Sequence, residues 1–177
     1  MVSDSSRFGI TASEKLAGGV TARATVETSL AVTNPVGGPD SKMGDRQSTI
    51  GLASRMGSID LGRAFTSHFL AITNNDAFGT LYGSIAGDVH HVRTVRSGDA
   101  VFVNVNAGPA AVAFDRTVTA AGAEATTYSV AGKLGPVNAT VAVFDSGSAK
   151  STVYAGQAKV SNLQVFASHS VNKDGAA

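Results

Sequence analysis

The stretch at residues 18–30, GGVTARATVETSL, alternates between two kinds of side chain. One parity is uncharged throughout (Val20, Ala22, Ala24, Val26, Thr28 and Leu30), whereas the other includes Arg23 and Glu27. A strand places successive side chains on opposite faces, so this pattern predicts one polar and one apolar face over about eleven residues. Such a strand, tilted near 45°, rises about 25 Å, the height of the apolar band of an outer-membrane barrel.

The composition narrows the class of protein. The net charge of +1 gives no basic field for nucleic acid, and the absence of Cys removes disulfides and thiolate metal sites. No apolar run approaches the roughly 18 residues of a membrane helix. Twenty Gly and little helical periodicity favour an all-β chain, which we treat as one domain over residues 1–177.

The same alternation recurs along the chain and predicts ten strands in five hairpins with tight turns of Gly, Pro, Ser or Asn. The strands lie around residues 8–12, 20–30, 49–53, 59–61, 101–105, 110–114, 128–134, 137–143, 154–158 and 163–167. The connections between hairpins (31–45, 66–95, 118–124 and 146–150) are longer and polar or rich in Gly and Pro. Short turns alternating with long ones are typical of an up-and-down barrel with one periplasmic and one outer end.

A membrane position explains where the charges fall. Lys or Arg on the lipid face at the bilayer centre costs roughly 2–4 kcal/mol. The central apolar series contains neither, whereas Arg23, Lys133 and Lys159 have the opposite parity. The alternative is a soluble β-sandwich, whose apolar series would form a core.

Two segments resemble a known family: SRFGITASEKLAGGVTARATVETSL and DRQSTIGLASRMGSIDLGRAF. The first is similar to a Ser-Arg strand followed by Ser-Glu-(Asp)-Leu-Gly-Gly-Gly. The second is similar to Arg-Gln-x-x-Val-Gly-Leu and Phe-Gly-x-Val-x-Leu-Gly-Arg. Over residues 5–65 the chain thus resembles the general diffusion porins of Gram-negative bacteria, particularly the trimeric sixteen-stranded type of β-proteobacteria.

The resemblance implies a pore constriction. In such porins an outer loop folds into the barrel and its acidic residues face wall arginines. Residues 66–95 resemble that loop, with Asp76 as the acidic partner, and the matching basic residues are Arg7, Arg46, Arg63 and Arg96. Parity places Arg7 toward the lumen, whereas Arg46 and Arg63 share the parity of lipid-facing neighbours and need a bulge or a strand end to redirect them.

Ten strands fall short of the sixteen that the resemblance implies. We therefore expect a fragment, a truncated relative, or a chain whose sheet is completed by another chain. A closed barrel of ten strands would be narrow, because about sixteen strands are needed for an aqueous channel. A trimer is implied only if the missing strands are supplied.

Other kinds of site have little support in the sequence. His90 and His91 beside Asp88, with His68 and His169 elsewhere, lack the spacing of a metal site. No nucleophile elbow or phosphate loop is present, so we expect neither an enzyme nor a cofactor.

The sequence therefore predicts an outer-membrane porin, embedded in lipid, that passes small hydrophilic solutes and ions by diffusion. The predicted pore lining is Arg23, Glu27, Lys133 and Lys159. The inward cations, Arg7 included, outnumber the inward acids Glu27 and Asp115, which predicts a mild anion preference. The alternatives are a soluble all-β binding or adhesion module and a nonconducting structural barrel.

Overall fold

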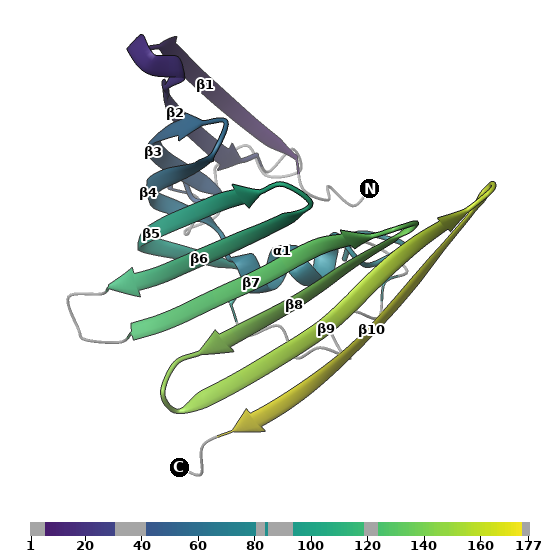
Figure 1. Ribbon diagram of the computed structural model, residues 1–177. Coiled ribbons are helices and arrows are strands. Elements are labelled where there is room, and N and C mark those ends of the chain that lie inside the picture. The colour runs from purple at the N-terminus through teal and green to yellow at the C-terminus, as the bar shows by residue number, and fades with distance from the viewer. Residues whose placement is uncertain (1–5, 31–41, 81–83, 85–93, 119–123, 175–177) are drawn as a thin grey trace.

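The ten predicted strands form one antiparallel sheet in which each strand pairs with its neighbours in the sequence (Figure 1). This computed structural model describes residues 6–30, 42–80, 84, 94–118 and 124–174. The strands are β1 (Arg7–Lys15), β2 (Thr21–Ser29), β3 (Gln47–Ser54), β4 (Gly57–Phe65), β5 (Arg96–Ala107), β6 (Ala110–Val118), β7 (Glu124–Leu134), β8 (Val137–Asp145), β9 (Ala149–Val160) and β10 (Leu163–Asp174). The prediction of ten strands in five hairpins is confirmed.

Tight turns join the strands at one end of the sheet and longer connections at the other, as predicted. A short 3-10 helix, Ala17–Gly19, joins β1 to β2. Gly108 and Gly135 occupy the two-residue turns after β5 and β7 with φ of 62° and 61°, a conformation that costs a residue with a Cβ more than it costs glycine. We call the opposite end, where the longer connections lie, the loop end.

The sheet is curved and open, with β1 and β10 as its two edges (Figure 1). One alternative from the sequence was a ten-stranded barrel closed on itself, and the described strands do not form it, because β1 and β10 are not paired. Edge strands present unpaired backbone groups that hydrocarbon cannot satisfy. In a membrane, further strands must therefore pair with β1 and β10.

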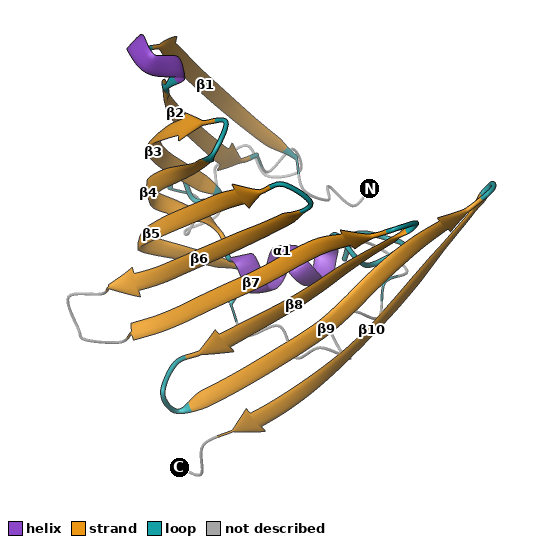
Figure 2. Ribbon diagram, in the orientation of Figure 1, coloured by secondary structure: helices purple, strands orange, loops and turns teal. Residues whose placement is uncertain are grey.

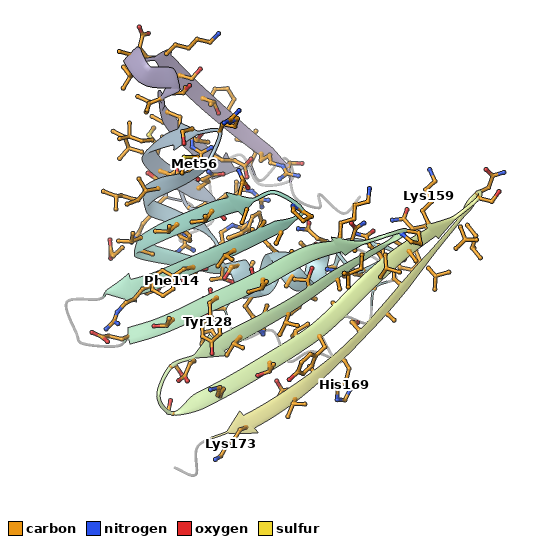
Figure 3. The ribbon with its side chains drawn as sticks, in the orientation of Figure 1. Met56, Phe114, Tyr128, Lys159, His169 and Lys173 are labelled. Carbon is orange, nitrogen blue, oxygen red and sulfur yellow. The ribbon has the colours of Figure 1, made fainter. Side chains whose placement is uncertain are left out.

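The two faces of the sheet differ as the alternation predicts. Large apolar side chains are exposed on one face, which we call the outer face: Ile50 pairs with Leu61 and Leu52 with Ile59. Figure 3 shows Phe114 and Tyr128, a cross-strand pair of the same face. The polar parity of β2, with Arg23 and its neighbours, lies on the opposite, inner face. Since soluble monomers rarely expose large contiguous apolar patches, the outer face suits lipid.

One short helix, α1 (Ser67–Thr73), lies against the inner face over β6 to β9 (Figure 2). The Thr66 hydroxyl caps it by accepting a hydrogen bond from the Phe69 N–H at 3.1 Å. Such a cap satisfies one of the amide groups that a helix start leaves without an intrahelical partner. No helix among the described residues is long and apolar enough to span a membrane.

The pairing of β4 with β5 shifts register between Gly62 and Ala64. Gly62 has φ of 123°, and a Cβ built there would lie 2.1 Å from the Ser48 carbonyl oxygen. Both the conformation and the close approach require glycine. The irregularity also contains Arg63, a residue whose strand parity points to lipid.

We therefore predict that Gly62→Ala destabilises the folded sheet by about 1–3 kcal/mol, because it adds both backbone strain and a steric clash. Urea unfolding in lipid vesicles measures this loss. Gly132→Ala is the matched control, since the nearest atom to a Cβ there is the Pro109 oxygen at 4.0 Å. Equal stability of the two variants would contradict this account of Gly62.

Candidate pore wall and arginine rim

Four arginines predicted from the resemblance lie at the loop end of β1 to β5. Arg7 is the first residue of β1 and Arg96 is the first residue of β5. Arg46 directly precedes β3, and Arg63 lies two residues before Phe65, the last residue of β4. The carboxylates nearest to them belong to Glu27 and Asp45. We call these residues the rim cluster: Arg7, Glu27, Asp45, Arg46, Arg63 and Arg96.

Glu27 joins two arginines that are distant in the sequence. Its Oε1 accepts a hydrogen bond from Arg46 Nε at 2.7 Å and lies 3.7 Å from Arg7 Nη1. Arg46 precedes the first residue of β3, so the alternation of that strand does not fix its direction. Its position before the strand thus lets Arg46 turn toward the side chain of Glu27 on the inner face.

Arg63 and Arg96 complete the cluster. Arg63 Nε donates to the Asp45 carbonyl oxygen at 2.7 Å, and Arg63 lines a rim cavity with Gly98 and Asp99. The Arg96 guanidinium lies 4.1 Å above the ring of Phe65, a cation–π contact. Arg46, Arg63, Glu27 and Asp45 all act electrostatically on Arg96. Groups that lie 33 to 69 positions from Arg96 along the chain thus act on it together.

Asp45 anchors the connection that leads into β3. Its Oδ1 accepts a hydrogen bond from the Ser29 N–H at 2.8 Å. Partial burial acts to raise the pKa of the Asp45 carboxyl, but hydrogen bonds from Ser29 and the positive charge of Arg46 outweigh burial and lower that pKa. Asp45 therefore contributes a negative charge beside the arginines at neutral pH.

Arg23, one of the predicted lining residues, does not present an isolated charge. Its Nε and Nη2 donate to Oδ1 and Oδ2 of Asp60 at 2.8 and 2.5 Å. The sequence count of inward charges omitted Asp60, although the outward parity of Ile59 and Leu61 was sufficient to find it. The anion preference was therefore predicted from a count of inward charges that lacked one carboxylate.

The other predicted lining residues lie at the tight-turn end. Lys133 and Lys159 share the parity of Thr127 and Ser151, which contact α1 on the inner face. Figure 3 shows Lys159 near the tip of the β9–β10 hairpin and Lys173 toward the opposite end of β10. Lys173 shares the parity of His169 and therefore lies on the outer face, so the inner-face residues Lys133 and Lys159 mark the tight-turn end alone.

The start of the predicted constriction loop is held on the wall by buried polar contacts. Asp115 Oδ1 accepts from the Ser67 N–H at 2.8 Å, and the hydroxyls of Ser67 and Thr127 lie 2.8 Å apart. His68 is fully buried, with its Nε2 3.1 Å from the Ser151 hydroxyl. Asp115 lies on the inner face as predicted, but it is buried beneath α1.

Asp76, the predicted acidic partner of the arginines, lies after α1. Its Oδ2 accepts a hydrogen bond from the Thr80 N–H at 2.6 Å, which stabilises its own turn. Within the described part of the chain no ion pair joins it to an arginine. Residues 81–83 and 85–93 of the predicted loop lie outside the described residues.

The histidines do not assemble a metal site within the described residues, which hold no group of three potential ligands. His68 belongs to α1 on the inner face, whereas His169 pairs with Tyr154 on the outer face of β10. His90, His91 and Asp88 lie outside the described residues. The inner face is thus a surface of hydroxyls, amides and opposed charges.

Three comparisons place this geometry among known proteins. Residues 1–102 of the 177 match a family model described as Gram-negative porin. No curated protein matches. Two solved structures of OmpT, an outer membrane protein of Vibrio cholerae, share the fold: the in-vitro folded form at TM-score 0.71 and 12% identity, and the outer-membrane expressed form at 0.72 and 13%.

The matches cover 93% and 95% of this chain but 55% and 56% of the two solved chains. The chain thus spans about half the length of these outer membrane proteins. At this low identity the likeness concerns the fold alone. It agrees with an open sheet whose two edges need further strands.

We predict that Asp115→Ala loosens α1 from the wall, because the buried Ser67 N–H loses its acceptor, which costs about 1–3 kcal/mol. Hydrogen exchange of the amides of residues 67–73 should become about tenfold faster or more. The control is Thr126→Val. Thr126 precedes Thr127 and has the opposite parity, so this change should leave the exchange unchanged. Unaltered exchange in Asp115→Ala would show that this contact does not hold the helix.

Proposed function

This chain belongs to the Gram-negative porin family and lies in the outer membrane, and from that premise we propose that it forms the wall of a water-filled diffusion channel. The solutes proposed are small hydrophilic molecules and ions. No covalent step is required of the wall, and we propose no enzymatic activity. Selection of solutes by their charge and size is sufficient for this function.

The observation that carries the proposal is the contrast between the two faces of one sheet. The outer face exposes Ile50, Leu52, Ile59 and Leu61, which suit lipid. The inner face opposite them presents Arg23, Thr25, Gln47, Thr49 and Asp60 around a cavity of about 390 Å³. A sheet that separates hydrocarbon from water in this way has the surface chemistry of a pore wall.

The proposed mechanism is electrostatic. Arginines of the rim cluster and carboxylates of Glu27 and Asp45 set up a local field at the loop end, which polar solutes experience as they pass. The segment of residues 66–95 is proposed to narrow the passage, supported by the position of α1 on the inner face over β6 to β9. Asp76 keeps its proposed role at this constriction.

An aqueous passage needs more wall than ten strands provide. We propose that further strands, from a longer chain or another copy, complete the barrel at β1 and β10. A trimer remains a prediction of the family resemblance. The second candidate, a nonconducting structural barrel, is favoured only by the cover that α1 gives to part of the inner face.

We predict that Thr25→Cys places a reactive thiol in the passage. The chain has no native cysteine, so a charged, water-soluble thiol reagent reacts at one position. In planar bilayers the reagent should lower single-channel conductance by roughly a third or more, since a charged adduct occupies an aqueous path. The matched control is Ala24→Cys, because Ala24 has the outer parity and the reagent does not dissolve in lipid.

Conductance steps that respond at residue 25 but not at residue 24 would support the channel. Confirmed insertion without any conductance would favour the nonconducting barrel. Equal responses at both positions would contradict the assignment of the inner face to water.

A further inference from the structure

We propose that Asp60, through its ion pair with Arg23, sets the ion selectivity of the inner wall between β2 and β4. This inference rests on the proposed function as a channel. Asp60 lies outside the rim cluster, and its carboxylate neutralises the positive charge of Arg23 on the wall. The consequence is that Arg23 contributes little net charge to the passage while Asp60 is present.

The pair has the geometry of a strong interaction. Two parallel contacts, Nε to Oδ1 at 2.8 Å and Nη2 to Oδ2 at 2.5 Å, join the guanidinium to the carboxylate. Ser58 adds a third contact, since its hydroxyl accepts from Arg23 Nη2 at 3.0 Å. A bidentate arginine–carboxylate pair fixes both side chains more firmly than a single contact does.

Gly51 makes this pair possible across an intervening strand. Arg23 on β2 lies opposite Gly51 on β3, which in turn lies opposite Asp60 on β4. A Cβ at residue 51 would lie 2.2 Å from Asp60 Oδ1 and 2.4 Å from the Ile59 carbonyl oxygen. The missing side chain therefore leaves the space in which the two charges meet.

The cavity around the pair is lined by polar and apolar side chains, and its lining includes one further carboxylate, Asp115, which is buried. Thr11, Thr25, Gln47, Thr49 and Asn104 line the same cavity. The side chain of Arg23 is 41% exposed and that of Asp60 10%, so the arginine faces the aqueous space with the carboxylate behind it. No second charge of the described wall is in contact with either group to compensate for the loss of its partner.

Removing either partner should therefore unmask the other. Two unit charges at contact distance in water interact strongly enough to change a local ion concentration several-fold, and less so in high salt. Loss of the Asp60 charge leaves Arg23 free to attract anions. Loss of the Arg23 charge leaves Asp60 free to attract cations.

The test is a double-mutant cycle in which the charge of each partner is removed singly and then together. The reversal potential of each variant is measured in a potassium chloride gradient across a planar bilayer at low ionic strength. Asp60→Asn should raise the ratio of chloride to potassium permeability about threefold, and Arg23→Gln should lower it by about the same factor. The double variant should return close to the parent ratio. The matched control is Glu124→Gln, which removes a carboxylate of the exposed pair with Arg116.

Glu124 and Arg116 share the parity of Tyr128 and Phe114, so their pair lies on the outer face. The control should leave selectivity unchanged. Conducting channels whose selectivity is the same in all four variants would overturn this inference while leaving the channel proposal standing. Absence of conductance in the parent protein would overturn the channel proposal itself.

Folding is checked separately for each variant by circular dichroism in detergent. If Asp60→Asn fails to fold, the charge exchange of Arg23→Asp with Asp60→Arg keeps the test available. That exchange preserves both charges and should retain the parent selectivity within about a factor of two. A large shift in the folded exchange variant would contradict the mutual cancellation of the two groups.

Discussion

One face of the sheet must contact hydrocarbon and the other must contact water, and the rest of the structure depends on this constraint. In hydrocarbon every backbone N–H and C=O needs a partner within the protein, so each strand must pair along both sides. The side chains then alternate between lipid and water with a period of two. A shift of one residue in register would exchange the two faces, which would expose Arg23 and Asp60 to lipid.

Glycine at selected positions allows this sheet to carry charge and to bend. Gly51 leaves room for the Arg23–Asp60 pair to cross β3, and Gly62 permits the close approach of β4 to Ser48. Gly51 is needed for space alone, whereas Gly62 is needed for both space and a positive φ. The charged inner surface thus depends on residues that bear no functional group.

Much of the fold was predictable because its signal is local. Alternation and turn residues identified all ten strands, and the tight and long connections fall at the predicted ends. The sequence also indicated that Arg46 needed redirection, and the structure shows that it lies just before β3. The same parity argument applies to Asp60, which lies between Ile59 and Leu61 in the sequence and therefore on the inner face.

Contacts between distant segments were not predictable from one sequence. Ser67 meets Asp115 and His68 meets Ser151 across 48 and 83 residues, and no periodicity encodes such pairs. The helix α1 is only seven residues long, too short for a clear apolar repeat, although Thr66 is a recognisable cap. These long-range contacts decide where the predicted constriction segment lies.

The most direct test of the central claim is a spin-label scan along β3, from Gln47 to Ser54, in lipid vesicles. Exposure alternates residue by residue along this strand. We predict that collision with lipid-soluble oxygen and with a water-soluble nickel complex alternates with a period of two and in opposite phase, with oxygen favoured at Ile50 and Leu52. Uniform access of the nickel complex to both faces would contradict the assignment of the outer face to lipid.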